Sequence, residues 1–129
     1  MNENQPIFQQ IMEKIESDII TNTYQTHDLI MSTTNIAIFY AINHATAVKA
    51  VGKLADAGIL YKKRGIGMCV AEGAKETITK RRKDAFLNQT IDALLEEAKT
   101  LGIPLDELIN EIKKKAAKPL LTVDISSVS

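Results

Sequence analysis

The sequence predicts a mainly helical α+β fold, and three observations carry this prediction. Two short helical patterns lie between Ser32 and Gly58, separated by a three-residue break at 41–43. Two short β-rich runs follow, on either side of a cluster of cations and glycines. Apolar residues then recur at helical spacing from Leu87 to Ile112. The order helix, turn, helix, hairpin predicts an N-terminal winged helix-turn-helix, which is followed by a two-helix C-terminal dimerisation hairpin.

The predicted division of the chain has three parts. We expect the winged helix-turn-helix over residues 1–73, a helical dimerisation region over 74–116 and a partly ordered tail over 117–129. No apolar run approaches the roughly 18 residues that a membrane span needs, and Cys69 is the single cysteine. We therefore expect a reducing, cytoplasmic setting in which Cys69 packs in the core.

The net charge is zero, but the charges are unevenly distributed along the chain. Residues 40–83 hold ten Lys and Arg against three Asp and Glu, a net +7, whereas 1–39 carry −4 and 84–129 carry −3. This basic block covers the second helix of the motif, the hairpin and the segment after it, where a DNA phosphate backbone would lie. The alternative is that these cations are ordinary solvated surface groups.

The first helix is predicted from Pro6 to near Asn22. Its apolar residues recur mostly every four positions, and Pro6 suits a first-turn position. The predicted buried stripe consists of Ile7, Phe8, Ile11, Ile15 and Ile19. Residues 23–30 have no helical period, so we expect a connecting loop there.

Cap residues and apolar spacing predict the two helices of the motif. Ser32 or Thr33 can cap a helix over 34–40, and Asn43 is the natural cap of the next helix, which Gly58 ends. The buried stripe of that second helix is predicted to be Ala47, Val48, Val51, Leu54 and Ala55. Its outer face is predicted to hold Thr46, Lys49, Ala50 and Lys53.

The hairpin is predicted to pair Ile59–Tyr61 with Met68–Val70, and its tip lies at 64–67. Glycines at the tip admit positive φ and a close approach of the backbone to DNA, although an ordinary turn is the alternative. The residues predicted to contact DNA are Ser32, Thr34, Asn43, His44, Ala45, Thr46, Lys49, Lys53, Lys62, Lys63, Arg64, Gly65 and Gly67. Base reading is expected from residues 44–46, and the cations and wing glycines are expected to position the phosphate backbone.

The last two predicted helices carry more apolar surface than such a pair can hide by itself. One runs from about Lys75 to Leu101 with a heptad-like seam, Gly102 ends it, and Pro104 opens the other. A second copy of the chain is the most economical cover, and the alternative is folding back on the winged domain. The predicted dimerisation residues are Leu87, Ile91, Leu94, Leu95, Ala98, Leu101, Leu105, Leu108, Ile109 and Ile112.

Five motifs, in order, carry a family resemblance. Residues 6–24 open with Pro-Ile-Phe-x-Gln-Ile, and 28–32 (DLIMS) stand where Gly-Asp-x-Leu-Pro-Ser is frequent. Residues 43–50 (NHATAVKA) match Asn-x-Asn-Thr-Val-x-Arg-Ala. Residues 54–60 (LADAGIL) match Leu-Glu-x-Glu-Gly-Leu-Ile, and 64–70 (RGIGMCV) match the wing pattern Lys/Arg-Gly-x-Gly-Met/Thr-Phe-Val. The ordered set resembles the GntR family of bacterial transcription regulators, and specifically its short YtrA-like subfamily.

The resemblance implies a homodimeric, cytoplasmic, DNA-binding regulator, often a repressor of its own operon, which in this subfamily frequently encodes ABC transporter parts. The family usually has Arg at the positions of Thr34 and Lys49, Asn or Ser at Ala45, and often a polar or basic residue at Val48. Arginine can bind guanine with two hydrogen bonds, whereas lysine mostly positions. Either this chain reads a different, A·T-rich operator through Thr46, Ala45 and thymine methyl groups, or its affinity for DNA is weak.

The expected function is sequence-specific DNA binding by a homodimeric transcription regulator. The alternative is a winged-helix protein-interaction module with weak or lost DNA binding. An enzyme is the least expected class, because the sequence has no paired His and Cys, no carboxylate pair on a shared face and no phosphate-binding glycine loop. Neither a metal site nor a cofactor is predicted.

Overall fold

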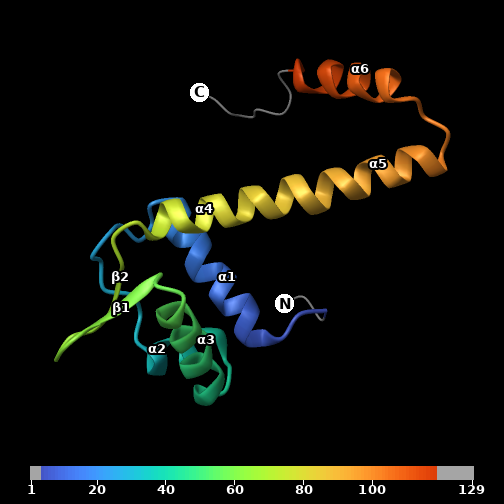
Figure 1. Cartoon of the computed structure of the whole chain (residues 1–129). Coiled ribbons are helices and arrows are strands. Elements are labelled where there is room, and N and C mark those ends of the chain that lie inside the picture. The colour runs from blue at the N-terminus through green and yellow to red at the C-terminus, as the bar shows by residue number, and fades with distance from the viewer. Residues whose placement is uncertain (1–3, 119–129) are drawn as a thin grey trace. The chain divides into compact units, whose positions relative to one another are not determined.

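A computed structural model describes residues 4–118 of the chain, and the helices and strands follow the predicted order (Figure 1). The elements are α1 (Ile7–Ile20), α2 (Thr33–Tyr40), α3 (His44–Asp56), β1 (Leu60–Lys63), β2 (Gly67–Val70), α4 (Ala74–Ala85), η1 (Phe86–Thr90), α5 (Ile91–Thr100) and α6 (Leu105–Ala116). The first five elements make a winged helix-turn-helix, as predicted. Residues 119–129, most of the predicted tail, lie outside the described residues.

The chain divides into two compact units, residues 1–83 and residues 84–129. The first unit continues past residue 73 because Ala74 and Ile78 of α4 are buried in its hydrophobic core. The core therefore needs the first turns of α4 as well as the winged helix-turn-helix.

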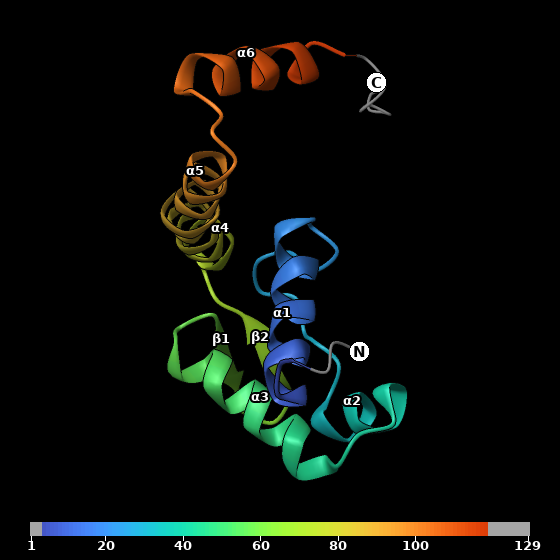
Figure 2. The ribbon, with the colours of Figure 1, turned by 90° about the vertical axis from the view of Figure 1, so that its right-hand side faces the viewer.

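Helices α1 and α3 lie side by side and supply much of that core (Figure 2). Ile11, Ile15 and Ile19 recur every four residues, so one stripe of α1 is buried. On α3, Ala47 and Ala50 are fully buried, and these small side chains allow close packing of the helices. The prediction that Ala50 lies on the outer face is therefore wrong.

Two predicted core positions are also exposed. Ile7, in the first turn of α1, is 46% exposed, because it precedes the part of the helix that packs on α3. Val48 is likewise 46% exposed, although its spacing from Val51 and Ala55 predicts burial. The core-facing stripe of α3 is centred on Ala47, Ala50, Val51 and Leu54, and Val48 lies outside it.

The wing is an antiparallel hairpin in which Leu60 pairs with Val70 and Lys63 pairs with Gly67. Its strands extend further towards the tip than predicted. The predicted loop 23–30 contributes a third short segment, since Leu29 bridges Cys69 and the Ile30 N–H donates to the Met68 carbonyl at 3.0 Å. This pairing was missed because strand partners far apart in sequence leave no local pattern. Cys69 is buried, as predicted.

Glu16 of α1 is the one polar or charged residue among residues 4–118 that is buried. Its Oε1 atom accepts from Arg81 Nη2 at 2.6 Å and from Arg82 Nη2 at 3.3 Å. Arg82 also donates to the Glu13 carbonyl at 3.1 Å and to Ser17 Oγ at 3.3 Å. These contacts hold α4 against α1 within the first unit.

In the second unit, the predicted long helix contains a π-helical turn, η1, before α5. Ala85 and Ile91, on either side of η1, keep right-handed helical dihedral angles. After α5, Gly102 adopts a φ of +72°, and the Ile103 N–H donates to the Ala98 carbonyl at 2.8 Å. This turn ends the helix at the predicted glycine, and α6 follows Pro104.

Replacing Glu16 by Gln tests the contact between α1 and α4. The change keeps the shape of the side chain but removes the charge that both guanidinium groups contact. We expect the free energy of unfolding, measured with urea, to fall by about 1.5 to 3 kcal/mol. Lys14→Ala is the control, because it breaks only the exposed Lys14–Asp18 pair and should cost less than about 1 kcal/mol. Equal losses in the two variants would contradict a special role for Glu16.

Candidate nucleic-acid interface

The N-terminal ends of α2 and α3 lie next to each other. Thr33 Oγ1 of α2 lies 3.4 Å from His44 Nε2 of α3. The turn between the helices needs Ala41 in the left-handed region, with a φ of 54°, which costs an L-residue roughly 1–2 kcal/mol. The Ile42 N–H closes this turn by donating to the Ala37 carbonyl at 2.9 Å. The sharp turn thus brings the two helix starts together.

Two of the predicted DNA-contacting residues cap these helices. Ser32 Oγ accepts from the Asn35 N–H at 3.1 Å, and Asn43 Oδ1 accepts from the Ala45 N–H at 2.8 Å. Both caps are as predicted. Because their acceptors satisfy helix N–H groups, Ser32 and Asn43 hold the helix starts in place whether or not they also touch a ligand.

The predicted base-reading residues differ in exposure. His44 and Ala45 are exposed, whereas Thr46 is half-buried. Val48 is exposed on the side of α3 away from the core, one turn after Ala45. The outer face of the first two turns of α3 is therefore formed partly by Ala45 and by Val48, which the apolar spacing predicts to be buried.

Lys49 and Lys53, predicted to contact the phosphate backbone, lie on the flank of α3 that borders α1. Lys49 Nζ is 4.2 Å from the centre of the Phe8 ring, and Lys53 Nζ is 5.8 Å from it. An aromatic face attracts a cation, so Phe8 orients both ammonium groups while leaving them exposed. No local sequence signal could have linked Phe8 to these lysines.

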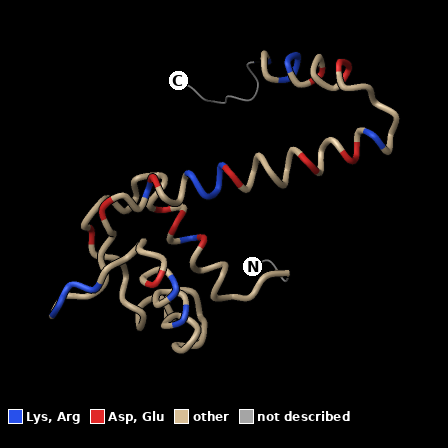
Figure 3. The backbone as a smooth tube through the Cα atoms, viewed as in Figure 1, with Lys and Arg blue, Asp and Glu red and all other residues tan. Residues whose placement is uncertain are grey.

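The wing brings the next predicted cations together. Lys62, Lys63 and Arg64 are exposed on or beside the hairpin. Lys and Arg mark the hairpin and α3 in Figure 3. Gly65 and Gly67 have φ values of +76° and +145°, which confirms the expected positive φ at the tip. A Cβ at Gly67 would lie 3.0 Å from Leu29 Cδ1, so any other residue there would also have to displace the Leu29 side chain.

Tyr61 of β1 fixes the loop that precedes α2. Its hydroxyl lies 2.9 Å from His27 Nδ1, and the two rings meet edge to face. Desolvation raises the pKa of the Tyr61 hydroxyl above its ordinary value of 10.0, so the phenol stays neutral at pH 7. The wing and this loop are therefore joined by side chains as well as by the Leu29 bridge.

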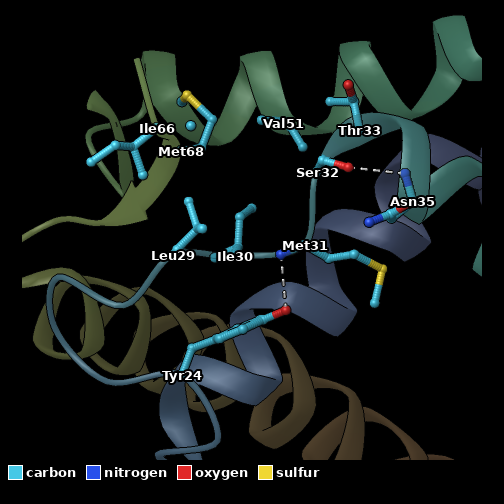
Figure 4. A pocket seen from close by; sticks show the side chains of 11 residues that line it. Tyr24, Leu29, Ile30, Met31, Ser32, Thr33, Asn35, Val51, Ile66 and Met68 are labelled. Atoms are coloured by element: carbon cyan, nitrogen blue, oxygen red, sulfur yellow. Dashed lines mark hydrogen bonds between the residues drawn. The ribbon is translucent and has the colours of Figure 1, made fainter. Parts of the chain in front are cut away.

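A pocket of about 490 Å³ opens between the wing and the start of α2 (Figure 4). Leu29, Ile66 and Met68 supply apolar lining, and Ser32 lies at the start of α2. Tyr24 supports the segment that joins Leu29 to Ser32, because its hydroxyl accepts from the Met31 N–H at 3.2 Å. This pocket could not be predicted from the sequence, because its lining joins Leu29 of a predicted loop to Ile66 of a predicted turn.

The cations of the basic block, residues 40–83, have different surroundings in the folded chain. Arg81 and Arg82 are paired with Glu16, which occupies part of their hydrogen-bonding capacity, although both side chains stay partly exposed. The cations of α3 and the wing remain exposed.

Within residues 4–118, no group of three His, Cys, Asp or Glu could hold a metal ion. Among the same residues, no helix has the length and apolar character needed to cross a membrane.

The predicted dimerisation residues lie on η1, α5 and α6 and in the turn between α5 and α6. Most of them are incompletely buried. Ala98 is buried and Leu108 is half-buried. The exposed members are Leu87, Ile91, Leu94, Leu95, Leu101, Leu105, Ile109 and Ile112, with exposed fractions from 36% to 63%. The second unit therefore presents a large apolar surface.

No family model matches the chain. A transcriptional regulator of the GntR family from Bacteroides thetaiotaomicron, known from a crystal structure, is 31% identical to it in sequence. That match covers 86% of this chain and 96% of the other, with a TM-score of 0.73. The chain belongs to the GntR family.

Two regulators from Bacillus subtilis (strain 168) are similar to this GntR-family chain. The HTH-type transcriptional repressor YtrA is 27% identical over 112 residues, which are 87% of this chain and 85% of YtrA. The HTH-type transcriptional regulator YhcF is 26% identical over 110 residues, 85% of this chain and 89% of YhcF. The predicted resemblance to the GntR family and its YtrA-like subfamily is confirmed.

The similar structures include complexes with DNA. The DNA-binding domain of AraR, in complex with operator ORE1, matches 55% of this GntR-family chain and 89% of its own, with 26% identity and a TM-score of 0.51. The likeness covers a part of the chain about as long as its winged helix-turn-helix.

Asn43→Ala tests the helix cap in this GntR-family chain. The loss of the acceptor for the Ala45 N–H should lower the free energy of unfolding by about 1 kcal/mol. Asn43→Asp is the matched control, since aspartate keeps an acceptor at the cap and should cost much less. Thermal unfolding of both variants followed by circular dichroism makes the measurement. If Asp destabilises as much as Ala, the side chain is not acting as a cap.

Proposed function

We propose that this GntR-family chain is a sequence-specific DNA-binding transcription regulator that works as a homodimer. The observation that carries the proposal is the grouping of two capped helix starts, the exposed face of α3 and the cationic wing in the first unit. A major groove accepts one helix, and the adjacent phosphates accept the cations. The similar AraR domain, which was solved in complex with an operator, supports DNA binding by a chain of this fold.

The second unit supports the homodimer. Its exposed leucines and isoleucines, whose exposed fractions are 36% to 63%, would each gain roughly 0.5–2 kcal/mol if their remaining exposed surface were buried, so they favour association. In this proposal 1–73 is the DNA-binding domain and 74–116 is the dimerisation region, whose first helix also packs in the core of the first unit through Ala74 and Ile78. We propose that α5 and α6 form the hairpin of the dimerisation region. A symmetric dimer would present two copies of α3 to two half-sites.

The regulated genes are proposed from the subfamily alone. The likeness to the repressor YtrA supports repression, and we propose that the chain represses its own operon in the cytoplasm. Transporter genes are the proposed content of that operon, as the resemblance implies.

Selection of bound duplexes from a random pool tests DNA binding and base preference together. We expect a palindromic pair of half-sites to be enriched, and the selected duplex to shift in a gel at about 50 mM salt, where electrostatic attraction is strong. The competing function is a winged-helix module that binds another protein. It is favoured by the absence of arginine among the residues of α3, and a failure to shift any duplex would support it.

Arg64→Ala tests the wing as a positioning element. The loss of one phosphate contact should weaken binding to the selected and to a scrambled duplex alike, and should reduce the salt slope by about 1. Fluorescence anisotropy at two salt concentrations measures both quantities. Lys14→Ala removes one positive charge from α1 and serves as the control. A loss confined to the selected duplex would indicate base reading by Arg64 instead.

The double variant Ile91→Asp with Leu94→Asp tests the homodimer. Both side chains are at least 36% exposed within the chain, so the variant should fold while charge repulsion separates the copies. Light scattering should give twice the chain mass for the wild type and the chain mass for the variant. Ile38→Asp, at an apolar residue of α2 that is 73% exposed, is the control. A monomeric wild type would refute the dimer without affecting the evidence for DNA binding.

A further inference from the structure

Val48 is an apolar side chain exposed in the middle of the proposed DNA-binding surface. It is 46% exposed, and its neighbour one turn earlier, Ala45, is exposed too. Both belong to the half of α3 nearest its N-terminus, which the proposed function places in the major groove. These two positions offer methyl groups and no hydrogen-bonding side-chain atom.

The polar side chains next to Ala45 and Val48 either contact another side chain or are partly buried. His44 Nε2 lies 3.4 Å from Thr33 Oγ1, and Thr46 is half-buried. Lys49 is an exposed polar neighbour, and its ammonium group lies 4.2 Å from the centre of the Phe8 ring. The first turns of α3 therefore present an apolar contact where a hydrogen-bonding reader would otherwise stand.

The charges around this contact decide which partner fits it. Lys49 and Lys53 border it on α3, and the wing supplies Lys62, Lys63 and Arg64. A surface of that kind suits a polyanion better than the apolar face of another protein. In the major groove, the apolar group that marks a base pair is the C5-methyl of thymine.

We propose that Val48, supported by Ala45, reads thymine by contact with its C5-methyl group. The inference rests on the proposed function and deepens it, because it assigns the base and names the residue that recognises it. Val48 then acts as a specificity-determining residue, while the cations hold the duplex in register.

Deoxyuridine provides the test, because it lacks the thymine methyl and keeps every hydrogen-bonding group. The selected duplex is remade with one thymidine at a time replaced by deoxyuridine, and the Kd of the full chain is measured by fluorescence anisotropy. Loss of one buried methyl should weaken wild-type binding about fourfold at one or two positions in each half-site. At those positions Val48→Ala should reduce the effect to less than about twofold.

Ile38→Ala is the control, since Ile38 is exposed on α2 and takes no part in the proposed contact. It should retain the full wild-type response to deoxyuridine. Uniform tolerance of deoxyuridine by the wild type, or an undiminished response in Val48→Ala, overturns the assignment of Val48 while DNA binding stands. If the wild-type chain binds no duplex at about 50 mM salt, the proposed function fails and the assignment fails with it.

Discussion

The buried carboxylate of Glu16 is the constraint on which the first unit depends. A carboxylate taken out of water needs charged partners, because without them it costs several kcal/mol. Arg81 and Arg82 supply these partners only if α4 runs along α1. In that position α4 also delivers Ala74 and Ile78 to the core behind the wing. Two ion pairs and two buried apolar residues therefore explain why the unit extends beyond the winged helix-turn-helix.

The same constraint determines which cations remain for a ligand. Since Arg81 and Arg82 are committed to Glu16, the exposed positive charge of the interface comes from α3 and the wing. Phe8 of α1 then orients Lys49 and Lys53 on α3. Helix α1 thus packs against α3, pairs with Arg81 and Arg82 through Glu16, and contacts Lys49 and Lys53 through Phe8.

Local features of this chain could be predicted from sequence, and distant pairings could not. The caps Ser32 and Asn43 act on residues two or three positions away, so their signal is complete within a short window. The Leu29 bridge to Cys69 and the approach of Lys49 to Phe8 join residues about 40 positions apart. Apolar spacing likewise predicted that α3 has a buried stripe, but Val48 and Ala50 are both apolar, and only packing against α1 decides which is buried.

Val48 is exposed although its apolar spacing predicts burial, and this difference points to a partner. An exposed β-branched residue in a helix adds nothing to helix propensity and leaves apolar surface in water, so folding gives no reason for it. Positions where a residue breaks a local rule are where a partner is expected. The same reasoning applies to Ile91 and Leu94, which are exposed on α5. Their surroundings separate the two cases: cations border Val48, whereas further exposed leucines and isoleucines accompany Ile91 and Leu94. A polyanion suits the first surface, and a second copy of the chain suits the second.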